Sequence, residues 1–300
     1  MSRQRVRFAR RTFLKDAALL AAALPFGPRI AAALLKSAPD QNEEIVAQKF
    51  HMAAARSLQT APIGDVMAAI GLSFIGTPYV AHTLEASGPE HLVINLHGLD
   101  CTTFVENVLA LSRSVRLKLT TFDGFTGQLQ MIRYRSGTIQ GYPSRLHYFT
   151  DWIGDNERKQ IVRDITRELG GMPLVKKFDF MSTHVKSYPQ LSDASALEAI
   201  RAAELRLSAA PHTYVPRTSV ADMQDKLRSG DIIAITTSIP GLDVSHTGMI
   251  AVKDGTPYYL HAPLSGGAVQ LSQGSLASYL ASGGKQTGII VARPVELGGN

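Results

Sequence analysis

Hydrophobic positions follow two different periods along the chain. Within residues 43–59, 62–74 and 101–111, apolar side chains recur at the spacing of an amphipathic helix. From residue 231 onward, short runs rich in Ile and Val are separated by Gly, Asp or Pro, which is typical of strands joined by turns. The predicted strands are Asp231–Thr237, His246–Val252, Pro257–Pro263, Ala268–Leu271 and Thr287–Arg293. A helical half followed by an antiparallel meander predicts an α+β fold.

A long region, residues 112–225, separates these two halves. Its apolar spacing predicts further helices near Asn156–Leu169 and Ser195–Leu207. No repeat or low-complexity stretch marks a second domain. We therefore expect one catalytic domain over residues 34–300 with a helical insertion at about 112–225.

Residues 1–33 have the composition of a targeting signal. Basic residues are followed by the hexapeptide Arg-Arg-Thr-Phe-Leu-Lys at 10–15, an apolar run at 17–26 and three alanines at 31–33. This order resembles the twin-arginine export signal of bacteria and predicts a periplasmic protein cleaved after about Ala33. A membrane anchor is the alternative, but the apolar run is shorter than the roughly 20 residues of a spanning helix. We expect no stable membrane insertion of the mature chain.

The positive charge of the chain lies in that segment. The net charge is +6, and residues 1–33 account for all of it with seven Arg or Lys against one Asp. The remaining residues carry 24 basic and 24 acidic side chains, so nothing in their balance indicates a nucleic-acid partner. With 45% hydrophobic and 19% charged residues, the composition is that of a folded globular protein and excludes wholesale disorder.

Cys101 is the only cysteine, so it cannot form an internal disulfide. A buried, small apolar residue is one interpretation of it. Its neighbours favour another, because Asp100 is suited to cap a helix that Cys101 begins. The N–H groups at a helix N-terminus stabilise a thiolate and also an oxyanion. We therefore expect a nucleophile with a lowered pKa that iodoacetamide labels readily near neutral pH.

Two histidines lie on strands that the turn Asp254-Gly255 is predicted to join. If Lys253 faces Thr256, His246 lies opposite Pro263, and His261 lies two residues further along on the same face. Such a pair can bind metal, but no HExxH, CxxC or carboxylate cluster accompanies it, so the metal interpretation is weak. One histidine as base, the other orienting it and a helix-capped cysteine form a constellation for acyl transfer to a thiol.

The motifs follow the order found in NlpC/P60 cysteine hydrolases. They are Gly76–Tyr79, Asp100–Val105, Gly230–Ile233, Ser245–Gly248 and Leu260–Ala262. More closely, the chain resembles the DUF1460 branch of that superfamily, described as N-acetylmuramoyl-L-alanine amidase-like. Segments that resemble this branch in particular are Leu96–Val108, Ser144–Trp152 and Gly241–Gly248. The resemblance spans about residues 60–294.

This resemblance implies a papain-like α+β fold that acts on peptidoglycan fragments without a cofactor. By position, Cys101 is the nucleophile, His246 the general base and acid, and His261 the residue that orients His246. Tyr79 and Asp100 match residues of the family's substrate site. Each also has a structural interpretation, since Tyr79 can pack at a turn and Asp100 can simply cap the helix.

A polar and aromatic cluster lies inside the insertion. It comprises Arg145, His147, Tyr148 and Trp152, and it is suited to stacking on a sugar and holding a carboxylate. The alternative is an amphipathic segment that covers the core. On the first interpretation, these residues bind substrate.

The implied activity is that of an N-acetylmuramoyl-L-alanine amidase, which cleaves the amide between the lactyl group of the sugar and L-alanine in muropeptides. A γ-D-glutamyl-diaminopimelate endopeptidase is one alternative, and a non-catalytic module that binds the cell wall is another. A hydrolase is favoured because binding alone requires neither Cys101 nor the two histidines.

Overall fold

The protein, a computed structural model, is described for residues 28–281 and 283–298. Most of the predicted export signal, residues 1–27, lies outside the described residues. Contacts between residues divide the chain into two units, residues 1–40 and 41–300, and the candidate site belongs to the second. Among the described residues, no helix is both long and apolar enough to cross a bilayer.

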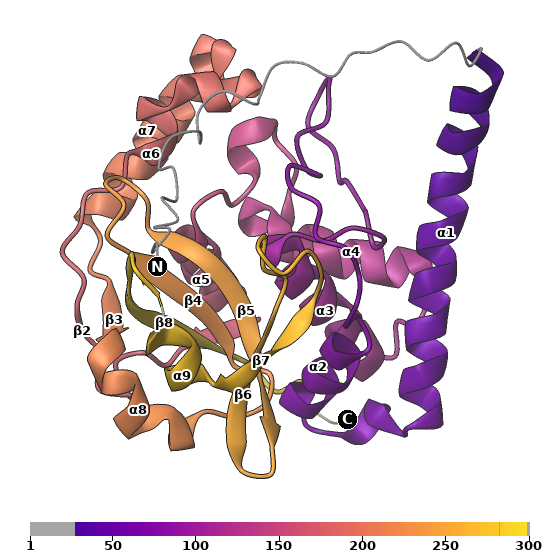
Figure 1. The fold of residues 1–300 in the computed structure, drawn as a ribbon. Coiled ribbons are helices and arrows are strands. Elements are labelled where there is room, and N and C mark those ends of the chain that lie inside the picture. The colour runs from indigo at the N-terminus through magenta and orange to yellow at the C-terminus, as the bar shows by residue number, and fades with distance from the viewer. Residues whose placement is uncertain (1–27, 282, 299–300) are drawn as a thin grey trace, which may run out of the picture. The chain divides into compact units, whose positions relative to one another are not determined.

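An eight-stranded sheet in which every pairing is antiparallel carries the fold (Figure 1). Its order is β2-β3-β8-β4-β5-β6-β7, and β1 also pairs with β8. The strands are β1 Val162–Asp164, β2 Met172–Pro173, β3 Thr213–Pro216, β4 Ile232–Thr237, β5 Val244–Lys253, β6 Thr256–His261, β7 Gln270–Ser275 and β8 Gln286–Pro294. All five strands predicted from the sequence are present, with ends that differ by up to a few residues.

The position of β8 differs from the predicted meander. The strand does not extend the sheet beyond β7 but crosses back to lie between β3 and β4. Its central run is buried on both faces, with Ile290 and Ala292 in one core and Ile289 and Val291 in the other. A continuous apolar run of this kind is stable only inside a sheet that is covered on both sides.

Helices cover both faces of the sheet. The helices are α1 Pro28–Ala55, α2 Ile63–Leu72, α3 Cys101–Arg116, α4 Phe122–Arg133, α5 Phe149–Arg158, α6 Phe180–Thr183, α7 Ala194–Ala209, α8 Val220–Met223 and α9 Leu276–Ala281. Side chains of α2, α3, α4 and α5 share one core with Ile232 and Met249, whereas those of α8 and α9 share another with Ile233 and Ile250. Successive side chains along β4 and β5 point to opposite faces of the sheet, so they contribute alternately to the two cores.

The predicted helix over Asn156–Leu169 is wrong beyond Arg158, where α5 ends. Gln160 has a φ of 57°, which turns the chain, and Val162–Asp164 then form β1 against β8. The β-branched pair Ile161 and Val162 is buried there, which favours a strand over a helix. The predicted helix over Ser195–Leu207 is confirmed by α7.

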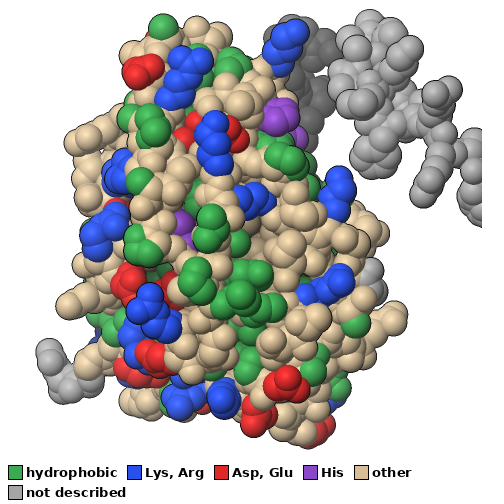
Figure 2. All heavy atoms as spheres, turned by 90° about the vertical axis from the view of Figure 1, so that its left-hand side faces the viewer, with side chains coloured by type: hydrophobic (Ala, Val, Ile, Leu, Met, Phe, Trp, Pro, Cys, Tyr) green, Lys and Arg blue, Asp and Glu red, His purple; other side chains and the backbone are tan. Residues whose placement is uncertain are grey.

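The insertion at 112–225 is therefore not purely helical, because it supplies β1, β2 and β3 to the sheet. It also has a small core of its own, built around Tyr148, Phe178 and Ile200. Figure 2 shows one face of the molecule, on which Lys and Arg side chains are spread out and several lie beside Asp or Glu. Among the described residues, Arg163 forms an ion pair with Glu168 and Arg206 with Asp151.

Candidate active site

Local hydrogen bonds fix the start of α3. The Thr103 N–H donates to Asp100 Oδ1 at 2.7 Å, and the Asp100 N–H donates to Thr103 Oγ1 at 2.9 Å. This reciprocal pair is a capping box, which sets Cys101 as the first residue of the helix. The segment before it is held by a bond from the Leu99 N–H to the Pro78 carbonyl. The predicted position of Cys101 at a helix N-terminus is confirmed.

The thiol of Cys101 is free of any disulfide, but its surroundings differ from the sequence expectation. Burial, and secondly the charge of Asp100, raise the pKa of the thiol above its ordinary value. Hydrogen bonds from the Thr247 backbone, the Thr247 hydroxyl and Thr102 act in the opposite direction without cancelling this effect. The dipole of α3 favours a thiolate, yet the capping carboxylate lies one residue away. Cys101 therefore rests as a neutral thiol.

Alkylation tests this protonation state. Because the pKa is raised, only a small fraction of Cys101 is thiolate at neutral pH, and the thiolate is the reacting form. We expect the rate of labelling by iodoacetamide to be low at pH 7 and to keep rising beyond the pH at which glutathione, as the reference thiol, levels off. A rate that reaches its plateau at a lower pH than that of glutathione would show a thiolate already formed at rest.

The hairpin of β5 and β6 brings the two histidines together. Lys253 pairs with Thr256 and Gly248 with His261, which is the register that the turn predicted. Asp254 and Gly255 both have positive φ, 50° and 75°, as a two-residue hairpin turn requires. His246 Nε2 and His261 Nδ1 lie 2.7 Å apart, within hydrogen-bonding distance.

Both imidazoles are neutral at physiological pH. Burial lowers the pKa of His246 to about 4. The pKa of His261 falls to about 3, first through burial and secondly through the charge of His246. Two neutral rings share one hydrogen bond when one nitrogen donates and the other accepts. The pair can therefore orient His246 and leave its Nδ1 for proton transfer.

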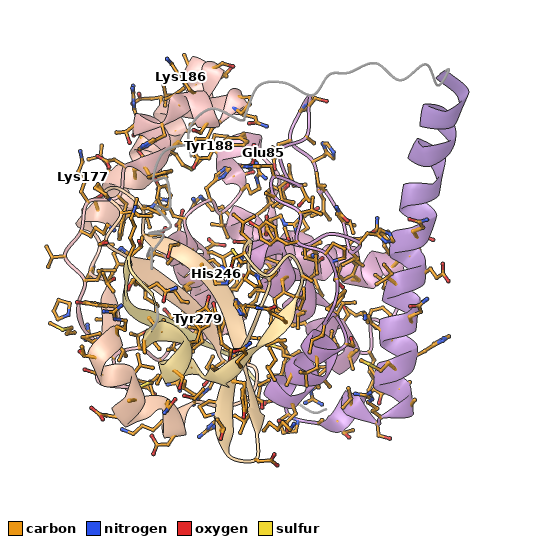
Figure 3. The ribbon with its side chains drawn as sticks, in the orientation of Figure 1. Glu85, Lys177, Lys186, Tyr188, His246 and Tyr279 are labelled. Atoms are coloured by element: carbon orange, nitrogen blue, oxygen red, sulfur yellow. The ribbon has the colours of Figure 1, made fainter. Side chains whose placement is uncertain are left out.

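Thr247 links Cys101 to the histidine pair. This residue follows His246 on β5, and its backbone and side chain lie close enough to the thiol to lower the thiol pKa. The thiol lies within electrostatic range of Tyr259 and Tyr279, whose rings contact His261. Figure 3 labels His246 and Tyr279 close together in the region of β4 and β5. Among the described residues, the hydrogen bond of the His246 ring is to His261 and not to the thiol.

Tyr79 also lies beside Cys101. Its pKa is raised to about 12 by burial and then by the charges of Cys101 and Asp100. The Tyr79 N–H donates to the Gly267 carbonyl at 2.8 Å, which fixes the backbone at this point. The structure therefore brings Tyr79 and Asp100 together with Cys101, and Asp100 acts as the helix cap.

Arg145 and His147 line a small cavity next to the residues that flank Cys101. Its volume is about 170 Å³, and Asp100 and Thr102 form part of its wall. Arg145 is held by an ion pair with Glu85 at 2.9 Å. His147 shares a hydrogen bond of 2.9 Å with the Tyr142 carbonyl, and burial, together with Arg145, lowers its pKa to about 3. Both predicted residues are thus close to the residues that flank Cys101.

Tyr148 and Trp152 do not form a sugar platform in this structure. Trp152 is fully buried and stacks on Phe149 at 4.8 Å between ring centroids. Tyr148 is 3% exposed, and its hydroxyl donates to Glu204 at 2.7 Å. The apolar face of α5 requires a core to pack against, so the alternative interpretation, a segment that covers the core, holds for these two residues.

Comparisons with known proteins identify the family of the chain. A family model described as N-acetylmuramoyl-L-alanine amidase-like matches residues 69–288. The chain belongs to this amidase-like family. No curated protein matches it.

Solved structures extend the comparison. A crystal structure of an N-acetylmuramoyl-L-alanine amidase from Bacteroides uniformis is 39% identical, with a TM-score of 0.74, over 78% of this chain and 99% of that one. A Bacteroides fragilis protein provisionally named a xylanase is 38% identical, with a TM-score of 0.70, over 74% and 98%. A DUF1460 protein from Legionella pneumophila shares the fold at 20% identity, with a TM-score of 0.67, over 87% and 96%.

Three residues of this amidase-like site escaped sequence reasoning. Thr247 follows His246 directly on β5. Tyr259 precedes His261 by two positions on β6, so the two-residue period of a strand could have placed it on the same face as the histidines. Tyr279 comes from α9, and no local pattern linked it to the histidines. Within residues 41–281 and 283–298, no three His, Cys, Asp or Glu side chains are grouped as metal ligands.

Proposed function

We propose that the protein is a cysteine-dependent N-acetylmuramoyl-L-alanine amidase of the NlpC/P60 type. The observation that carries this proposal is the thiol at the capped start of α3, close to Thr247, the residue that follows His246, with His246 within hydrogen-bonding distance of His261. Membership of the amidase-like family supports an amide of a peptidoglycan fragment as the scissile bond. The protein then acts outside the cytoplasm, as the arginine-rich segment at residues 1–33 indicates.

Acylation begins with attack of Cys101 Sγ on the lactyl carbonyl carbon, while His246 Nδ1 takes the thiol proton. Because both groups are neutral at rest, this proton moves during the attack and not before it. His246 Nε2–H then donates to His261 Nδ1 and keeps the charged ring in place. The carboxylate of the Asp100 cap accepts a hydrogen bond from the Thr103 N–H. The N–H groups of Cys101 and Thr102 therefore remain to stabilise the oxyanion.

Collapse of the tetrahedral intermediate breaks the C–N bond. The L-alanine nitrogen leaves with the proton held by His246, and the lactyl group remains as a thioester on Cys101. His246 next takes a proton from a water that attacks the thioester. Collapse of this second tetrahedral intermediate releases the lactyl carboxylate, and the proton returns from His246 to the sulfur. The cycle consumes one water and needs no cofactor.

The bond that is cleaved distinguishes the amidase from the endopeptidase. A disaccharide tetrapeptide is expected to yield free sugar and an intact peptide that begins with L-alanine, as mass spectrometry of the products would show. The matched substrate is the same peptide without sugar, which offers no lactyl amide and should remain uncut. Release of an L-alanyl-D-glutamate fragment, alone or still joined to sugar, would establish cleavage after D-glutamate.

The provisional name of the Bacteroides fragilis relative does not favour a glycosidase here. Glycoside hydrolysis generally needs two carboxyl groups free to act on the sugar. In the cavity beside Cys101, Asp100 caps α3, Glu106 is paired with Arg133 at 2.7 Å and Glu85 with Arg145. Each acid is thus already engaged, whereas the thiol and the histidine pair are arranged for acyl transfer.

A further inference from the structure

The ring of His261 is enclosed by two tyrosines. Tyr259 stacks on it with centroids 4.6 Å apart and an interplanar angle of 27°. Tyr279 meets it edge to face at 4.9 Å and 75°, and the two tyrosine rings contact each other at 5.1 Å. Tyr259 also meets the edge of His246 at 5.8 Å. These contacts come from β6 and α9, so they fix the imidazole from two separate elements.

We propose that Tyr259 and Tyr279 are positioning residues that hold the His261 imidazole against His246 and shield it from water. The inference rests on the proposed function in one respect, the role of His246 as the base. Neither tyrosine is placed on the reacting atoms, and both act through His261.

Orientation is the first part of the argument. His261 can accept from His246 Nε2–H only through Nδ1, and the 2.7 Å separation shows that this edge faces His246. A turn of the ring about its Cβ–Cγ bond would move Nδ1 away. The stacked Tyr259 ring opposes that turn, because a rotating imidazole would strike the face beside it.

Shielding from water is the second part. His261 is only 1% exposed, yet it lines a cavity of about 570 Å³ together with Tyr279 and neutral polar residues that include Gln270 and Ser278. Removal of the Tyr279 ring would enlarge this cavity next to the imidazole. Water there would stabilise the imidazolium and raise the His261 pKa from about 3 towards its ordinary value.

Protonation of His261 would break the arrangement. An imidazolium carries a proton on Nδ1 as well, so it cannot accept from His246 Nε2–H. The titratable groups around His261 are His246 from β5, Tyr259 from its own strand and Tyr279 from α9, with Cys101 of α3 acting on both tyrosines. Among the described residues, His246 is the one charge that shifts His261. Activity therefore falls with pH first as His246, whose pKa is about 4, is protonated, and a His261 pKa above that value moves the loss to higher pH.

The test compares Tyr279→Ala with Tyr279→Phe, which keeps the ring. The His261 ring is titrated by NMR in a Cys101→Ser background, and the pH profile of kcat/KM is measured in the active chain. For Tyr279→Ala we expect the His261 pKa to rise from about 3 to above the value of about 4 for His246, so that the acid limb of the profile moves to higher pH, with roughly tenfold lower kcat at the acid limb and unchanged KM. In Tyr279→Phe, the His261 pKa and the acid limb of the profile should match those of the wild type.

Leu276→Ala is the matched packing control, because Leu276 is fully buried on α9 in the same core but belongs to neither ring contact. It should lower stability and leave the His261 titration unchanged. The proposal is overturned if Tyr279→Ala titrates like the wild type, or if Leu276→Ala shifts the titration equally. NMR reads His261 without turnover, so a failure of the amidase assignment would appear separately, as the absence of muropeptide cleavage.

Discussion

Replacement of Cys101 by alanine is expected to abolish muropeptide hydrolysis while the fold stays intact. The side chain is small, and the capping box of Asp100 and Thr103 does not depend on it. Loss of the nucleophile removes both the thioester and the proton exchange with His246, so the rate should fall by at least about 10⁴. Cys101→Ser should be nearly as inactive, because neutral His246 is too weak a base to activate a hydroxyl quickly. Product formation is followed by chromatography, and folding by thermal unfolding.

Ser114→Ala provides a control on the same helix. Ser114 is buried and bonds the Ala110 carbonyl at 2.9 Å, more than three helical turns from the cap. This variant should lose some stability and keep its rate. Wild-type turnover in Cys101→Ala would refute the cysteine mechanism. Undiminished binding to peptidoglycan by a wild type that shows no turnover would instead identify a wall-binding module.

Residues close together in the sequence were enough to predict the start of α3 and the register of the two strands that carry the histidines. Asp100 and Thr103 are spaced for a capping box, so the start of α3 could be read from the sequence. Asp254-Gly255 is a turn with a defined register, and that register placed His246 and His261 on one face. In both cases residues within a few positions of one another determine the geometry.

Features that depend on distant packing could not be predicted in this way. Tyr148 and Trp152 resemble a sugar platform until the core that covers them is known. The pKa of the Cys101 thiol is raised mainly by burial, which depends on how the rest of the fold packs around it. The insertion of β8 between β3 and β4 requires knowledge of both sheet faces. Each outcome is set by residues far apart in the sequence.

His246→Ala is expected to reduce kcat by about 10³ to 10⁴, and His261→Ala by roughly 10-fold to 100-fold. In the proposed mechanism, His246 transfers the proton in both half-reactions, whereas His261 only accepts its Nε2–H. His261→Asn should recover part of the loss, because the amide oxygen can also accept that bond. Steady-state kinetics on one muropeptide substrate give all three values. Equal losses in the two alanine variants would contradict the division of roles.

Treatment with a chelator separates this scheme from a metal site built on the same two histidines. A general base that takes its proton from Cys101 does not depend on a metal ion, so EDTA should leave kcat and KM unchanged. If the histidines were zinc ligands, activity would fall on chelation and return with added zinc. His261→Asn discriminates further: an acceptor is enough to orient His246, but an asparagine amide is a poor substitute for an imidazole on zinc. Partial recovery in His261→Asn together with resistance to EDTA is the result expected for the cysteine mechanism.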